Sequence, residues 1–214
     1  MAHERRARFP ARFPQHVTLR IRESAGSARR ARVMRVVRQA IRAGGHQVDF
    51  RVVEFSVQSN HMHLLVEASG AESLTRGMIG LEVRLARRIN RVLARRGSFF
   101  ADRYHSRSLR TPAEVRSAIR YVLFNHRHHA SSGKAATSML AARGSGTSLD
   151  PCSSAVWFDG WDAPFNPREA WQKELLSRGR PHARATNWLL TTGWKRGGLL
   201  GVDEQPGPQR RGRR

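Results

Sequence analysis

Residues 16–130 predict a ferredoxin-like α+β fold, the split βαβ arrangement in which helices cover one face of a four-stranded antiparallel sheet. Short segments of alternating apolar and polar residues predict the strands. Two longer segments with apolar residues at helical spacing separate these strands, and a strong helix-start signal follows the last one. The predicted order is strand, helix, strand, strand, helix, strand and one added C-terminal helix.

The first strand and the first helix are expected within residues 16–45. In HVTLRIR (16–22), apolar residues alternate with polar ones, the period of a half-buried strand. The helix is expected to have Ser27 as its cap and to end at Gly44 and Gly45. Its apolar positions are Val33, Val36, Val37, Ala40 and Ile41, and its other face is a row of arginines.

A hairpin and a long helix follow. Residues 47–57 and 61–67 are rich in strand formers, and the turn residues 58–60 separate them. The second helix is expected over residues 73–95 and the fourth strand at about 104–110. The apolar stripe of that helix is Leu74, Met78, Leu81, Leu85, Ile89 and Val92.

The last helix has the clearest start signal. Thr111 and Glu114 have the spacing of a capping box, in which each side chain accepts a hydrogen bond from the backbone of the other residue. Pro112 suits the first helical position, where no N–H is needed. We therefore expect a helix from Pro112 onward, with a core stripe of Val115, Ala118, Ile119 and Val122.

The charge of the chain predicts a polyanionic partner. The formal net charge is +23 over 214 residues, and residues 1–130 carry 26 Lys and Arg against 9 Asp and Glu. Of the 39 basic residues 36 are arginines, whose guanidinium fork can contact two phosphate oxygens. A codon bias toward arginine is the alternative cause of that preference, but it does not explain the shortage of acids. Nucleic acid is the expected partner.

Two divisions of the chain are expected. Residues 1–130 form the basic domain, and residues 131–214 comprise a Gly/Ser-rich linker, a Trp-rich basic extension and a disordered basic tail. The five tryptophans pack against the main domain or stack on DNA. The single Cys152, the lack of a long apolar run and the lack of an apolar leader predict a cytoplasmic, nucleoid-associated protein without a membrane partner.

The hairpin strand at 61–67 carries two histidines one residue apart. Because side chains alternate along a strand, His61 and His63 share one face, while Met62, Leu64 and Val66 face the helices. The two imidazoles are either packed core residues or ligands of one divalent ion. Five of the remaining histidines (His16, His105, His126, His128 and His129) are expected at the surface or at helix ends.

The capped helix supplies the remaining groups of a candidate site. Tyr121 and Asn125 are four residues apart and therefore lie on one side of the helix, on the flank of its core stripe. A metal held by His61, His63 and the Asn125 oxygen could polarise a phosphate beside the Tyr121 hydroxyl. The alternative tyrosine, Tyr104, starts a strand and has no partner at helical spacing.

SNHMHLLVEA and RYVLFNHRHH together resemble the HUH endonucleases, and in particular the REP-associated tyrosine transposases, relatives of the IS200-like single-strand transposases. The resemblance covers about residues 9–130. It implies that His61 and His63 form the metal motif, Tyr121 is the nucleophile and Asn125 is a further ligand. The family usually has proline after the asparagine, whereas this chain has His126, which leaves the end of the helix open.

The resemblance implies a transposase that cleaves and rejoins single-stranded or hairpin DNA through a 5′-phosphotyrosine, with Mg²⁺ or Mn²⁺ as cofactor. The protein would act as a monomer or a homodimer. Candidate phosphate-binding residues are Arg20, Arg22, Arg51, Arg103, Arg107 and Arg120. Two alternatives remain: a non-catalytic, transposase-derived nucleic-acid-binding protein, and a replication or conjugation nickase, although nickases often have two neighbouring tyrosines.

Overall fold

The computed structural model of the chain describes residues 13–130 and 149–204, without the side chains of residues 128–130. Four strands form one sheet in the order β2-β3-β1-β4, and every neighbouring pair is antiparallel. The strands are β1 (Gln15–Arg20), β2 (Phe50–Val57), β3 (His61–Ala68) and β4 (His105–Ser108). The order and directions confirm the ferredoxin-like prediction.

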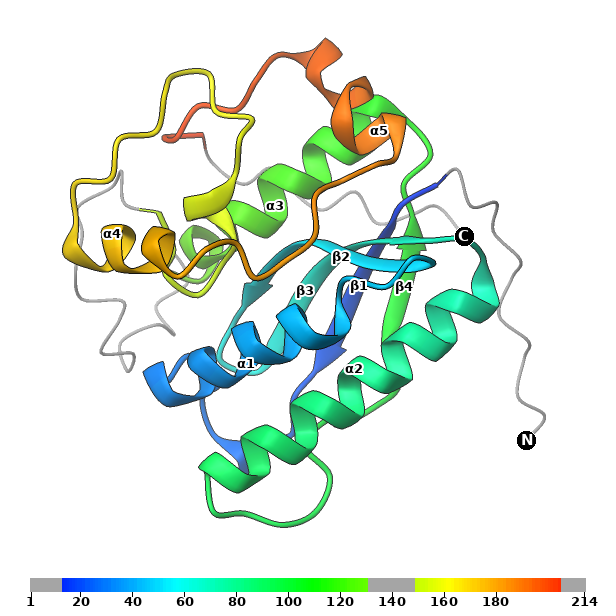
Figure 1. Cartoon of the computed structure of the whole chain (residues 1–214), viewed down its shortest axis with the longest axis vertical. Helices are drawn as coiled ribbons and strands as arrows, with labels where there is room; N and C mark the ends of the chain where they lie inside the picture. Colours follow the sequence, from blue (N-terminus) through cyan, green and yellow to red (C-terminus); the bar gives the residue numbers. More distant parts are fainter. Residues whose placement is uncertain (1–12, 131–148, 205–214) are drawn as a thin grey trace.

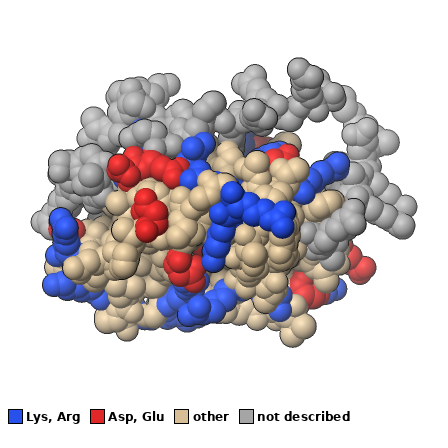
Figure 2. Space-filling model, turned by 90° about the horizontal axis from the view of Figure 1, so that it is seen from above, with Lys and Arg blue, Asp and Glu red and all other residues tan. Residues whose placement is uncertain are grey.

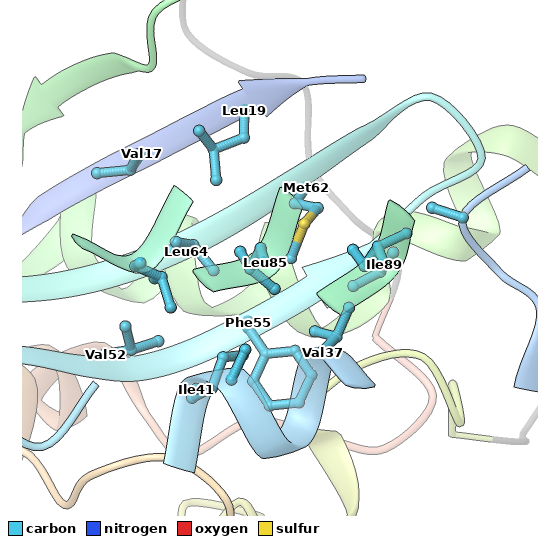
Figure 3. Packing of buried hydrophobic residues seen from close by; sticks show 14 of the residues in the cluster. Val17, Leu19, Val37, Ile41, Val52, Phe55, Met62, Leu64, Leu85 and Ile89 are labelled. Carbon is cyan, nitrogen blue, oxygen red and sulfur yellow. The ribbon is translucent and has the colours of Figure 1, made fainter. Parts of the chain in front are cut away.

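Helices cover both faces of this sheet (Figure 1). α1 (Ala31–Gly44) and α2 (Ala71–Val92) pack on one face, and α3 (Pro112–Ala130) lies on the other. The first core contains the inward residues of β1, β2 and β3 together with the apolar stripes of the two helices. Figure 3 shows Leu19, Met62 and Leu64 pointing from the sheet toward Leu85 and Ile89. The packing face expected for β3 is therefore confirmed.

A second core lies between the other sheet face, α3 and the C-terminal segment. Val53 and Leu65 point from the sheet toward α3, whose outer side is covered by residues 149–204. That segment contains η2 (Ala155–Trp157), α4 (Ala170–Ser177), α5 (Trp188–Thr191) and η3 (Gly193–Gly197). Trp157, Trp161 and Trp194 are buried, which favours the packing interpretation for these tryptophans. The expected linker at 131–148 and the basic tail at 205–214 lie outside the described residues.

The start of α3 is confirmed in detail. The Glu114 N–H donates to Thr111 Oγ1 at 3.2 Å, and Glu114 Oε2 accepts from the Thr111 N–H at 3.2 Å. The helix continues past His126 to Ala130, because histidine keeps the backbone N–H that a proline at this position would lack.

Two local expectations are wrong. Ser27 does not cap α1, because its Oγ accepts from the Arg29 N–H and the helix begins later, at Ala31. β2 begins at Phe50 rather than at residue 47, because the Gln47 N–H donates to the Phe50 carbonyl and closes a turn. In both places a local turn takes the backbone hydrogen bonds that the longer element would need.

Candidate active site

The pairing of β1 with β3 places a group of polar side chains on the sheet face that α3 covers. Thr18 pairs with His63, and Arg20 pairs with His61. Directly paired residues project to the same side of a sheet, and so do alternate residues along one strand. His16, Thr18, His61 and His63 therefore share the face opposite α1 and α2.

The two histidines of β3 lie close together and are held by neighbouring groups. Their ring centroids are 4.7 Å apart in an edge-on arrangement. His61 Nδ1 lies 2.7 Å from Asn60 Oδ1. His63 Nδ1 lies 3.1 Å from His16 Nε2 and 3.2 Å from Thr18 Oγ1.

Tyr121 on α3 packs against these rings. Its ring centroid is 5.0 Å from that of His63 and 5.8 Å from that of His16, edge-on in both cases. The side chain is half-buried, and burial raises the pKa of its hydroxyl above the usual value. The structure thus brings together the tyrosine and the histidine that are about 60 residues apart in the sequence.

Asn125 lies one helical turn after Tyr121 and is 1% exposed. Within the described residues, neither its Oδ1 nor its Nδ2 has a hydrogen-bond partner. A buried amide without partners is costly, so a ligand or water for it is expected. Two imidazoles and an amide oxygen are donors that suit Mn²⁺ or Mg²⁺, so these residues fit a divalent cation. In the described part of the chain, no group of three or more His, Cys, Asp or Glu side chains is placed to hold a metal ion.

His16 is the site residue that sequence reasoning missed, because it was expected at the surface. It is 5% exposed, since β1 is an inner strand of the sheet and its face is covered by α3. Burial, with a smaller contribution from the Arg107 charge, lowers the pKa of His16 to about 4. The sequence did contain a signal for its position: His16, Thr18 and Arg20 are alternate residues of one strand and therefore lie on the same face.

Tyr104, His105 and His126, which the sequence analysis also considered, have different surroundings. Tyr104 is buried in the first core, so it does not belong to this group. His105 is exposed, and His126 Nδ1 lies 3.9 Å from Asp150 Oδ2. The side chains of His128 and His129 lie outside the described residues.

Three of the six candidate arginines lie at the His61 end of the sheet. Arg20 pairs with His61, and its carbonyl accepts from the Ala101 N–H, which brings the segment containing Arg103 alongside. Arg22 follows β1 at the same end. Arg20 has one weak, exposed contact with Asp102 at 3.7 Å, whereas no ion pair is found for Arg22 or Arg103 within the described residues.

The other three arginines contact carboxylates within the fold. Arg51 lies 3.5 Å from Glu67, Arg107 lies 3.9 Å from Glu114, and Arg120 lies 3.6 Å from Glu204. Figure 2 shows one face of the molecule on which acidic side chains lie beside basic ones. The excess positive charge is therefore partly used in intramolecular contacts.

Two comparisons with known proteins gave a match, and one gave none. A solved structure described as a REP-associated tyrosine transposase bound to a REP hairpin matches with 15% identity and a TM-score of 0.49, covering 63% of this chain and 76% of that one. No curated protein matches the chain. None of the helices within residues 13–130 and 149–204 combines the length and apolar character of a membrane span. The family model described as IS200-like transposase matches residues 14–124, more than half of the sequence. The chain therefore belongs to the IS200-like transposase family.

Proposed function

We propose that the protein cleaves and rejoins single-stranded hairpin DNA, with Tyr121 as the nucleophile. The observation that carries this proposal is the packing of the Tyr121 ring against His63, at 5.0 Å between centroids. A tyrosine that packs against the imidazoles of a candidate cation site supports a phosphodiester transesterification, in which the tyrosine hydroxyl is the nucleophile.

In the proposed step, Tyr121 Oη loses its proton and forms a bond to phosphorus. The bond from phosphorus to the 3′ oxygen breaks, and that oxygen takes up a proton to become a 3′-hydroxyl. The 5′-phosphate remains on Tyr121, so the phosphodiester energy is kept. Attack by another 3′-hydroxyl reverses the step and rejoins the strand.

His61, His63 and Asn125 are the residues that would hold Mg²⁺ or Mn²⁺. When bound, the cation would polarise the phosphoryl oxygens and stabilise the charge of the transition state. The burial of Asn125 and its unpartnered amide support this assignment. Arg20, Arg22 and Arg103, at the same end of the sheet as His61, would bind the phosphates of the strand.

Covalent capture tests the function. The full chain is incubated with labelled hairpin DNA bearing single-stranded flanks and with Mn²⁺, and a protein–DNA adduct that survives denaturation is expected. Tyr121→Phe should abolish the adduct, because it removes only the hydroxyl. An adduct that persists in Tyr121→Phe would overturn the nucleophile assignment.

The same assay addresses the metal and the non-catalytic alternative. His61→Ala with His63→Ala should abolish Mn²⁺-dependent cleavage while leaving DNA binding measurable. Unchanged cleavage would reject the metal assignment. If wild-type protein binds the hairpin tightly but forms no adduct at any Mn²⁺ or Mg²⁺ concentration, the protein is a binding module.

A further inference from the structure

The two histidines of β3 share one feature: each presents its Nδ1 atom to a group of the protein. His61 Nδ1 is 2.7 Å from the side-chain oxygen of Asn60. His63 Nδ1 is 3.1 Å from His16 Nε2 and 3.2 Å from Thr18 Oγ1. In both rings the same nitrogen is engaged, although the partners come from different strands and loops.

The contact of His61 determines one tautomer, whereas the contacts of His63 are compatible with two. The Asn60 Oδ1 atom can only accept, so His61 Nδ1 must carry the proton in that hydrogen bond. His63 Nδ1 can donate to Thr18 Oγ1 or to His16 Nε2, or accept from either of them, because a hydroxyl and a neutral imidazole can both donate and accept. A neutral imidazole with its proton on Nδ1 has its lone pair on Nε2, and a metal binds to a lone pair.

We propose that Asn60, Thr18 and His16 are positioning residues, which hold His61 and His63 in the Nδ1–H tautomer so that Nε2 of each ring is the cation-binding atom. Metal-ligating histidines usually donate their second N–H to a protein group, which fixes both the tautomer and the ring orientation. The cation and the choice of tautomer at His63 rest on the proposed function, whereas the Nδ1–H form of His61 follows from its contact with Asn60 and does not depend on it.

The place of these residues in the fold explains why they can act in this way. Thr18 lies directly opposite His63 in the β1–β3 register, and His16 is two residues away on the same face. β1 lies between β3 and β4, so its backbone is held on both edges. Asn60 is in the turn that connects β2 to β3, and its carbonyl accepts from the Ile21 N–H at 2.8 Å.

The tautomer can be measured without any metal. Long-range ¹H–¹⁵N correlation spectra of the full chain, labelled at histidine and assigned with His61 and His63 variants, distinguish Nδ1–H from Nε2–H. Both rings should be in the Nδ1–H form in wild-type protein. Thr18→Val with His16→Phe should convert His63 alone to a mixture, and Asn60→Ala should convert His61 alone. An Nε2–H form of either ring in wild-type protein overturns the inference for that ring.

Cation affinity gives the second readout. Mn²⁺ binding measured by calorimetry should weaken about tenfold in Thr18→Val with His16→Phe and in Asn60→Ala. Thr18→Ser should keep wild-type affinity. Thr191→Val is the matched control, because it removes a hydroxyl that donates to the Asn187 carbonyl on α5, and its affinity should be unchanged.

The two failures are distinguishable. Equal Mn²⁺ affinity in wild type, in Thr18→Val with His16→Phe and in Asn60→Ala overturns the positioning role. Absence of Mn²⁺ binding in wild-type protein overturns the cation part of the proposed function, and the spectra then decide alone whether the three residues hold the rings.

Discussion

Arg29 and Asp150 form a bidentate ion pair that joins the segment before α1 to the segment before η2. The guanidinium nitrogens lie 2.7 and 2.9 Å from the two carboxylate oxygens, and the side chains are 11% and 1% exposed. Asp150 also accepts from the Cys152 N–H at 2.9 Å. The C-terminal segment is therefore held to the segment before α1 by this ion pair, in addition to its packing against α3.

Asp150→Asn should lower the free energy of unfolding by about 3 kcal/mol, because it leaves a buried guanidinium without its charge partner. Urea unfolding of the full chain measures this loss. Glu174→Gln is the control, because it breaks an exposed pair with Arg178 and should change stability by about 0.5 kcal/mol or less. Equal losses in the two variants would contradict the role of burial.

The pH dependence of this pair has a definite sign. Burial favours the protonated acid, but the Arg29 charge outweighs it and holds the pKa of Asp150 below its usual value. The stabilisation is thus present at neutral pH and is lost as the pH falls through that lowered pKa. Wild-type and Asp150→Asn proteins should therefore approach equal stability only in strong acid.

Two glycines of α2 should respond in opposite directions to alanine. A Cβ at Gly77 would overlap the ring of Phe50, which is 1% exposed and cannot move aside. Gly77→Ala should therefore destabilise the protein by about 1–2 kcal/mol, despite the better helix propensity of alanine. A Cβ at Gly80 meets nothing within 4 Å, so Gly80→Ala should stabilise by about 0.5–1 kcal/mol. Thermal unfolding of the pair measures both signs, and stabilisation by Gly77→Ala would reject the close packing.

Glu54 and His182 form a buried polar contact that is not an ion pair at neutral pH. His182 Nε2 and Glu54 Oε2 are 3.9 Å apart. Burial raises the pKa of Glu54 to about 8, and burial with the nearby Arg180 charge lowers the pKa of His182 well below its usual value. The folded protein therefore holds a proton on Glu54 that the unfolded chain releases above pH 4.5.

Stability should consequently fall as the pH rises through the pKa of Glu54. Between pH 7.5 and 8 the slope should be about 0.7–1 kcal/mol per pH unit, because Glu54 is still largely protonated in the folded protein and is ionised in the unfolded chain. Above pH 7.5 His182 and His16 are largely neutral in both states, because their pKa is lowered in the folded protein and their ordinary value is 6.5. The pKa of Cys152 is about 12, so these three groups contribute little. Glu54→Gln should remove the slope in denaturant titrations. A wild-type slope that survives in Glu54→Gln would assign the effect to another group, with Asp159 and Arg180 the charged neighbours to examine.

Local patterns in the sequence were enough to predict those parts of the site that lie on a single strand or a single helix. The same-face placement of His61 and His63 follows from strand alternation, and that of Tyr121 and Asn125 follows from helical spacing. The start of their helix at Pro112 was equally predictable, because a capping box is complete within four residues.

Contacts between distant segments were not predictable in this way. His16 is part of the site because α3 covers the face of β1 opposite α1 and α2, and the alternation of residues in β1 does not show which helix covers that face. The carboxylate of Glu67 accepts from the Thr186 and Asn187 N–H groups at 2.7 and 2.8 Å and so fixes α5 beside α3. The sequence around Glu67, Thr186 and Asn187 carries no local signal for these hydrogen bonds, which depend on tertiary packing.

The distribution of arginines leads to a prediction about salt dependence. Arg22 and Arg103 are exposed at the His61 end of the sheet, whereas Arg51 lies 3.5 Å from the largely buried Glu67 carboxylate and 3.2 Å from Thr186 Oγ1. A cation already neutralised by a carboxylate releases few counterions from DNA. Arg22→Ala and Arg103→Ala should each reduce the slope of log K against log[salt] for a single strand by about 0.7, the value for one phosphate contact. Arg51→Ala should leave that slope unchanged and instead lower the free energy of unfolding, as measured by urea titration. Equal slopes for the three variants would mean that DNA binding depends only on the total charge of the protein and not on the arginines at the His61 end.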